Sequence, residues 1–262
     1  MNPAQTIRDA VSRVSALRQA SQKDPALHRA ITSVKRFQAL RFAQTYTDLL
    51  SAGPYKDAAR FFLDELYSDK DYSVRDAQFS RIAGALQTFF PKQVVAIAVS
   101  LAELHALTEE LDHRMGEEWL SNEGTEKANE AERYAGAWRA VGRREDRDTQ
   151  LNDVLELGYE LDQLTRASGL RMMLKMMRRP ASAAGLSSLQ SFLESGFDTF
   201  AQMNGRGRGA QEFLAIVRAR ESLLIEDLFA FEVPRIGQDD GFAAYYSPLD
   251  RHEPASVRGR PM

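Results

Sequence analysis

The stretch PKQVVAIAVSLAELHALTEELDHRM, residues 91–115, decides the fold because its apolar residues recur at helical spacing. They gather on one face when about 100° is allowed per residue. Proline at the first position suits the start of a helix. The stretch therefore predicts one long amphipathic helix, and its apolar face is set by Ile97, Leu101, Leu104 and Leu111.

The same spacing recurs along almost the whole chain, whereas the alternation typical of strands is nearly absent. We therefore expect an all-α fold, a single multi-helix bundle of about ten helices in one domain over residues 1–233. From residue 234 the periodicity ends, and residues 234–262 have the composition of an irregular tail. Two helices are expected before residue 55, the second starting with Asp24-Pro25. The others are expected near 56–67, 73–90, 91–115, 126–141, 146–167, 170–178, 187–203 and 210–230.

Composition and charge limit the classes of function. The chain has 262 residues, of which 34 are basic and 37 acidic, with a formal charge of −3. This balance gives no overall field that would attract nucleic acid or an anionic membrane, so we expect neither as a partner. The absence of cysteine excludes disulfides, thiolate zinc sites and a catalytic thiol. The N-terminus lacks the apolar core of a signal peptide, so we expect a cytoplasmic protein without a cofactor.

Three arginines are predicted to point toward the interior. Arg75 falls on the apolar arc of the 73–90 helix, Arg147 extends the arc of the 146–167 helix, and Arg220 lies inside the arc of the 210–230 helix. An isolated buried charge is costly, so each needs a carboxylate or a bound anion. The simpler interpretation is three separate ion pairs. The alternative is that two or three of them converge on a pocket for a small anionic ligand.

For Arg75 the sequence offers three nearby carboxylates, those of Asp69, Asp71 and Asp76. Ser73 and Asp76 also have the spacing of a capping box, which would start the 73–90 helix. We expect Arg75 to connect the preceding turn to the core through one of these aspartates.

The histidines offer little chemistry. Glu110 and His113 have the Glu-x-x-His spacing of ferritin-like metal sites, but both lie away from the apolar face and no second such motif exists, so we expect no metal site. His105 and Asp112 lie at the flank of the same helix, two turns apart. A general-base role for them needs a partner on another element.

The segment LRMMLKMMRR, residues 170–179, is rich in methionine and basic residues. Its four methionines cannot all face one core from a single helix, so we expect some to be exposed or at an interface. The segment could serve a protein partner or self-association, or it could be a gap-filling core helix.

Three segments resemble a family of uncharacterised bacterial all-helical proteins. They are FFLDELYSDKDYSVRDAQFSRI, LRMMLKMMRRPASAAGLSSLQSFLESGFDTF and FLAIVRARESLLIEDLF. The resemblance spans about residues 55–230 and implies a bacterial source and one domain. It brings no activity, cofactor or catalytic residue.

Three functions remain open at this point. The leading one is a non-enzymatic binding or regulatory module for a protein partner or a small anionic ligand. The second is an enzyme with an arginine-lined pocket that uses His105 and Asp112. The third is a purely structural helical subunit, which predicts no polar pocket. The observation that separates them is whether Arg75, Arg147 and Arg220 line one cavity.

Overall fold

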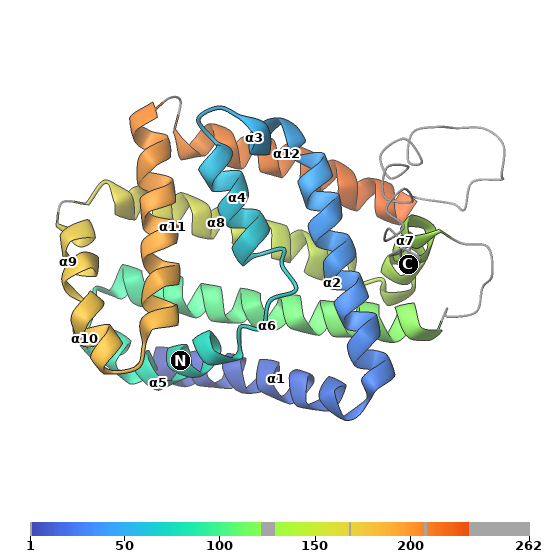
Figure 1. Ribbon diagram of the computed structural model, residues 1–262, viewed down its shortest axis with the longest axis horizontal. Coiled ribbons are helices and arrows are strands. Elements are labelled where there is room, and N and C mark those ends of the chain that lie inside the picture. Colours follow the sequence, from blue (N-terminus) through green and yellow to red (C-terminus); the bar gives the residue numbers. More distant parts are fainter. Residues whose placement is uncertain (1, 122–128, 168, 207–208, 231–262) are drawn as a thin grey trace, which may run out of the picture.

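The computed structural model of the chain describes residues 2–121, 129–167, 169–206 and 209–230 (Figure 1). These residues form twelve helices and no strand, which confirms the all-α class. In chain order the helices are α1 (Pro3–Lys23), α2 (Pro25–Thr45), α3 (Thr47–Ser51), α4 (Lys56–Glu65), α5 (Ser73–Phe89), α6 (Lys92–Ser121), α7 (Glu130–Val141), α8 (Arg144–Thr165), α9 (Leu170–Met176), α10 (Arg178–Ala183), α11 (Ser187–Arg206) and α12 (Ala210–Ala230).

The ten expected helices are present, together with two short ones. Helix α3 follows α2 after a break at Tyr46, and α10 continues from α9 after Met177. Helix α6 extends beyond its expected end. The predicted tail, 234–262, lies outside the described residues. None of the described helices is both long and apolar enough to cross a membrane.

Local sequence signals explain where several helices begin and end. The Asp24 side chain accepts hydrogen bonds from the backbone N–H groups of Ala26 at 3.0 Å and Leu27 at 3.2 Å, with Pro25 at the first helical position, as expected. Gly142 ends α7 with a positive φ of 64°, a conformation that glycine adopts without steric cost.

The expected capping box at the start of α5 is wrong. Ser73 lies inside the helix, and the N-cap residue makes no side-chain hydrogen bond. The Asp76 carboxylate instead accepts a hydrogen bond from Arg18 of α1 at 2.7 Å. Because the N-cap is Tyr72 and not Ser73, Asp76 does not occupy the position that a capping box requires, and its carboxylate contacts Arg18 instead.

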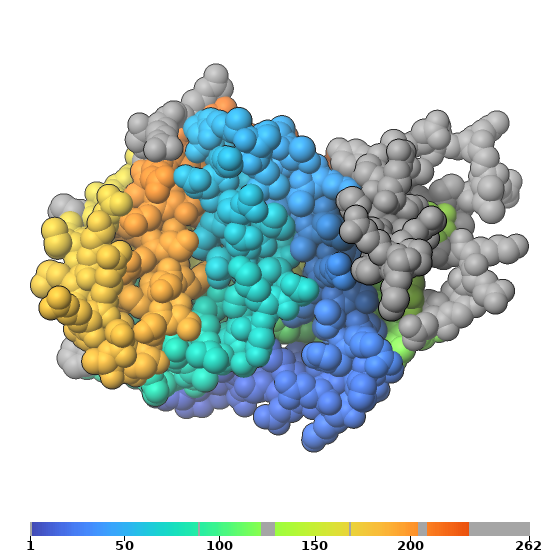
Figure 2. Space-filling view, in the orientation of Figure 1, coloured from blue at the N-terminus to red at the C-terminus, as the bar shows by residue number. Residues whose placement is uncertain are grey.

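The long helices α1, α6, α8 and α12 lie side by side in that order, and α2, α4 and α11 cross this layer (Figure 1). Helices α2 and α6 approach closely at Gly116. A Cβ atom there would lie 2.3 Å from Cγ1 of Ile31 and 3.2 Å from its Cα, so the crossing requires glycine. In the space-filling view α2, α4 and α11 form the near surface over the layer (Figure 2).

The apolar core consists of three clusters. One joins α2, α6, α7 and α12, a second joins α2, α4, α8, α11 and α12, and a third joins α1, α5 and α6. Charged side chains are also buried in the described part of the chain. They are Arg41, Asp76, Glu109, Asp112, Arg147, Asp162 and Glu221. Lys, Arg, Asp and Glu are rarely buried unless they are paired. The interior of this fold is therefore a candidate location for a functional site.

Candidate functional site

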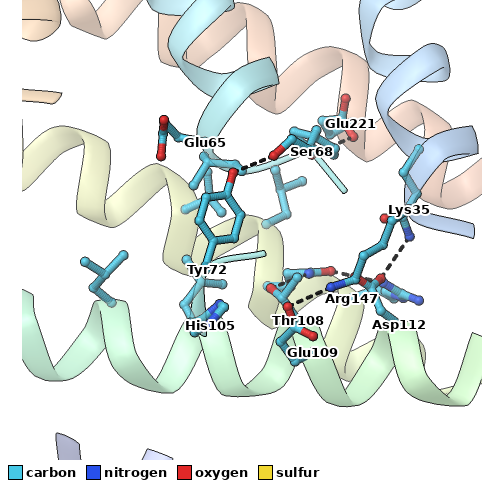
Figure 3. A pocket seen from close by; sticks show the side chains of 18 of the residues that line it. Lys35, Glu65, Ser68, Tyr72, His105, Thr108, Glu109, Asp112, Arg147 and Glu221 are labelled. Atoms are coloured by element: carbon cyan, nitrogen blue, oxygen red, sulfur yellow. Dashed lines mark hydrogen bonds and ion pairs between the residues drawn. The ribbon is translucent and has the colours of Figure 1, made fainter. Parts of the chain in front are cut away.

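A cavity of about 150 Å³ lies inside the fold, where α2, α6, α8 and α12 meet the segment that joins α4 to α5 (Figure 3). Six of the seven buried charged residues line it; the exception is Asp162. The cavity also has apolar walls, which include Leu101 and Val154. Its charged and titratable lining residues are Lys35, Arg41, Glu65, Tyr67, Tyr72, Arg75, Asp76, His105, Glu109, Asp112, Tyr134, Arg147 and Glu221.

Helix α6 contributes one row of polar side chains to this cavity (Figure 3). His105, Thr108, Glu109 and Asp112 are spaced so that they share one face of the helix. The structure therefore places the predicted His105 and Asp112 in the wall of the same cavity.

Arg41 of α2 and Glu221 of α12 form the most buried ion pair of the site. Arg41 Nη1 donates to Glu221 Oε1 at 2.6 Å, and the Tyr46 hydroxyl donates to the same oxygen at 3.0 Å. This pair was not predicted from the sequence. The helical spacing could have indicated the inward direction of Arg41, because Arg41 follows Val34 and Phe37 by seven and four residues and so lies on the same buried face of α2.

A second charged group connects α2 to α6. Lys35 Nζ donates to Glu109 Oε1 at 2.7 Å and lies 3.8 Å from Asp112 Oδ2. Gln38 Nε2 donates to Asp112 Oδ1 at 3.0 Å. Burial raises the pKa of Asp112 above its ordinary value despite the opposing charge of Lys35. Asp112 therefore keeps its proton to a higher pH than an exposed aspartate does.

A third group joins α1, α5 and α6. Asp76 Oδ2 lies 2.7 Å from Arg18 Nη1 and 3.0 Å from His105 Nε2. Burial alone would raise the pKa of Asp76, but His105 and Arg18 together hold it below its ordinary value. An ionised carboxylate can only accept, so Nε2 of His105 donates, and Nδ1 of a neutral ring is left to accept a proton.

Arg75 points inward, as the helical periodicity predicted, but its partner was predicted wrongly. Its Nη1 donates to Glu65 Oε2 at 3.0 Å. The guanidinium lies over the rings of Tyr72 at 3.9 Å and Phe192 at 4.5 Å. Glu65 ends α4, and the chain from 66 to 72 brings it opposite Arg75. Two of the predicted aspartates contact other groups: Asp71 accepts from the backbone N–H of Ser73, and Asp76 pairs with Arg18.

Arg147 of α8 is buried and forms no ion pair with the part of the chain that the structure describes. Its exposed fraction is 3%, and among the described residues no carboxylate oxygen lies within 4.0 Å of it. Its Nη1 donates to Gln150 Oε1 at 3.2 Å, and its guanidinium lies 4.0 Å from the centre of the Trp138 ring. Its Nη2 has no hydrogen-bond partner in the described part of the chain. Burial lowers the pKa of Arg147.

Gln150 holds this arginine in a short chain of hydrogen bonds between α8 and α6. Its Oε1 accepts from Arg147, and its Nε2 donates to the Thr108 hydroxyl at 2.8 Å. One donor of the guanidinium is thus oriented by neutral groups, while Nη2 is buried and has no hydrogen-bond partner among the described residues.

Arg220 is not part of the cavity wall, although it was predicted together with Arg75 and Arg147. Its guanidinium donates to both carboxylate oxygens of Asp48 at 2.8 Å and to the Thr45 carbonyl at 2.7 Å. At this level α12 faces the end of α2 and the start of α3, so the side chain runs along the surface. Two of the three predicted arginines therefore line one cavity.

The remaining sequence motifs are accounted for elsewhere. Glu110 pairs with Arg143 and His113 lies 3.6 Å from Glu117, while no group of three metal-ligating side chains is found among the described residues. In the 170–179 segment Met172 and Met176 are 63% and 71% exposed, which confirms that some of its methionines face outward. Their use by a partner stays a prediction.

Comparison with known families adds one finding. The family described as Domain of unknown function (DUF8198) matches the chain over residues 17–234. The chain belongs to this family. The match confirms the resemblance to an uncharacterised family that the three quoted segments indicated, and its bacterial source stays a prediction. No curated protein and no solved structure matches the chain. The function must therefore be argued from the geometry of the cavity.

Proposed function

We propose that this protein is a non-enzymatic binding or regulatory module that takes a small organic anion into the cavity, with Arg147 as the anchoring group. The observation that carries the proposal is the buried guanidinium of Arg147, which lacks a counter-ion and leaves Nη2 without a partner among the described residues. An uncompensated buried charge is expensive, and a bound carboxylate or phosphate would remove that cost.

The charges around Arg147 favour an anion over a cation. Each carboxylate that lines the cavity is within 4.0 Å of a basic group on another residue, such as Lys35 for Glu109 and Asp112 or Arg41 for Glu221. The raised pKa of Asp112 further reduces the negative charge close to Arg147. A planar carboxylate could accept from Nη2 and place its second oxygen toward a neighbouring donor.

The size of the cavity limits the ligand. Its volume, about 150 Å³, is similar to that of an apolar cavity that holds benzene. The part of the ligand that it encloses is therefore a carboxylate or phosphate with a compact apolar group, and the apolar walls suit such a group.

Titration calorimetry with butyrate, benzoate and inorganic phosphate tests the proposal. We expect at least one of these anions to bind the wild-type protein, and Arg147→Met to weaken that binding at least tenfold. Arg220→Met is the matched control, because it removes a guanidinium outside the cavity and should leave binding unchanged. Equal binding by wild type and Arg147→Met, or no binding of any of the three anions, contradicts the proposal.

An enzyme is the second candidate, and the His105–Asp76 contact favours it. A histidine oriented by a carboxylate in the wall of a cavity is the arrangement of a general base. Asp112, which was predicted to work with His105, lines the same cavity without contacting it. Hydrolysis of p-nitrophenyl esters that is lost in His105→Gln and kept in His113→Gln would support this candidate.

A purely structural role, the third candidate function, does not explain the cavity or the buried charge of Arg147.

A further inference from the structure

A second cavity adjoins the first and has a different lining. Its volume is about 120 Å³, and it lies between α4, α6, α8 and α11. No charged or polar side chain contributes to its wall. The lining residues are Phe61, Phe62, Leu66, Ile97, Leu101, Leu104, Val154, Leu157, Gly158, Leu161, Phe192, Leu193, Gly196 and Phe200. We call the cavity that contains Arg147 the polar cavity and this second one the apolar cavity.

The two cavities share part of their walls. Five residues line both, namely Leu66, Leu101, Leu104, Val154 and Phe192. All five are apolar, so no charged side chain belongs to the wall that the two cavities share. The apolar cavity therefore lies directly beside the polar one.

One face of α8 runs through both cavities. Arg147, Leu151, Val154, Gly158 and Leu161 follow one another at three- and four-residue spacing, which places them on the same side of the helix. The first two line the polar cavity, Val154 lines both, and the last two line the apolar cavity. At about 1.5 Å per residue, Val154 lies about 10 Å and Gly158 about 16 Å along the axis from Arg147.

Gly158 and Gly196 line the apolar cavity, and both pack closely against side chains of neighbouring helices. A Cβ atom on Gly158 would lie 2.6 Å from Cδ2 of Leu214, and one on Gly196 would lie 3.2 Å from Cζ of Phe61. Neither position can take a larger side chain without moving its neighbours.

We propose that the two cavities form one site for a medium-chain aliphatic carboxylate, with the carboxylate at Arg147 and the hydrocarbon chain in the apolar cavity. This inference rests on the proposed function and names its ligand class. An extended chain advances about 1.2 Å per bond, so a chain of about eight to twelve carbons reaches from Arg147 past Val154 into the apolar cavity. Shorter carboxylates fill the polar cavity alone.

The test is a chain-length series of linear carboxylates from butyrate to dodecanoate, measured by titration calorimetry below their micelle-forming concentrations. Burial of each methylene should raise the affinity about fourfold until the apolar cavity is full, at about ten carbons. Decanol, which lacks the charge, should bind at least tenfold more weakly than decanoate.

A substitution in the apolar cavity provides the second part of the test. Leu157→Trp fills that cavity and leaves the polar cavity untouched, so it should abolish the gain from chain length while butyrate binds as in the wild type. Leu223→Trp is the matched control, because Leu223 is exposed on α12 and lines neither cavity. If Leu157→Trp does not fold, Leu193→Trp at the half-exposed rim serves the same purpose.

The outcomes separate this inference from the function on which it rests. Anion binding that needs Arg147 but does not increase with chain length overturns the inference and leaves the proposed function standing. A chain-length gain that persists in full in the tryptophan variant of the apolar cavity, Leu157→Trp or its replacement Leu193→Trp, also overturns it. Failure of every carboxylate and of phosphate to bind overturns the proposed function itself.

Discussion

Arg41 and Arg147 line the same cavity and are almost equally buried, with exposed fractions of 5% and 3%, yet their surroundings differ. Arg41 has the Glu221 carboxylate at 2.6 Å, whereas Arg147 has only the neutral side chain of Gln150 at 3.2 Å and the face of Trp138. The charge of Arg41 has a partner within the fold, although its Nε, like Nη2 of Arg147, has no hydrogen-bond partner among the described residues. The second arginine is held in position without its charge being neutralised, which is the state that a binding site for an anion requires.

The pKa shifts follow the same division. Burial by itself lowers the pKa of both arginines, because it disfavours the charged form. At Arg41 the charge of Glu221 more than offsets this, and the pKa is raised. At Arg147 burial prevails and the pKa is lowered. Burial is therefore more than offset at Arg41 and only partly offset, by Tyr134 and Asp112, at Arg147.

The largest expected effect is that of breaking the complete pair. Glu221→Gln keeps the shape of the side chain but leaves the Arg41 charge buried without a carboxylate, and this should lower the free energy of unfolding by about 3–5 kcal/mol. Urea unfolding measures it. A loss under about 1 kcal/mol would mean that the pair is solvated and that the contrast with Arg147 does not hold.

Two aspartates in the cavity wall should respond to pH in opposite directions. The pKa of Asp76 is lowered from 3.8, so its contribution to stability is present above that pH and is lost as the pH falls through the folded-state value. The pKa of Asp112 is raised from 3.8, so the folded protein holds an extra proton, and stability decreases as the pH rises through the folded-state value.

Asn variants separate these two effects in melting temperatures measured between pH 3 and pH 7. Asp76→Asn should be less stable than wild type at pH 7, with a deficit that shrinks in acid as the wild-type carboxylate is protonated. Asp112→Asn should gain stability relative to wild type as the pH rises from about 4 to 7. The same pH trend in both variants would show that the assignment of the two carboxyl groups is wrong.

A smaller effect is expected at the surface. Arg220→Met removes an ion pair with Asp48, whose own pKa the arginine lowers, but both partners are reached by solvent. We expect a loss under about 1 kcal/mol in the free energy of unfolding, and a still smaller loss in high salt. A loss as large as that of Glu221→Gln would place Arg220 among the structural arginines.

The smallest effect on stability is expected at Arg147, although it is more buried than Arg41 and Arg220. Arg147→Met removes a charge that has no described counter-ion and keeps an apolar stem beside Trp138. Without ligand, the free energy of unfolding should stay within about 1 kcal/mol of the wild type or increase. A loss of several kcal/mol would show that Arg147 is already neutralised within the fold.

Most of the fold was predictable from the sequence because helix formation depends on local spacing and caps. Asp24-Pro25, for example, acts within a few residues of itself, and it was identified. The extra helices α3 and α10 were not. Each is five or six residues long, too short for periodicity to reveal.

The site was predictable only in part. Helical periodicity gives the direction of a side chain, so Arg75, His105, Asp112 and Arg147 were placed toward the interior or its flank. It does not give the partner, because the partner comes from another element. Glu65 reaches Arg75 only because the chain between α4 and α5 turns back.

The Arg41–Glu221 pair also sets the order in which the protein can become functional during its synthesis. The two residues are 180 positions apart, so α2 leaves the ribosome long before α12 is made. Until then Arg41 has no carboxylate from α12, and the wall that α12 contributes to the polar cavity is missing. Domains fold as units once their chain is available, so a nascent or truncated chain cannot form the cavity. Under the proposed function, anion binding would thus distinguish finished molecules from incomplete ones.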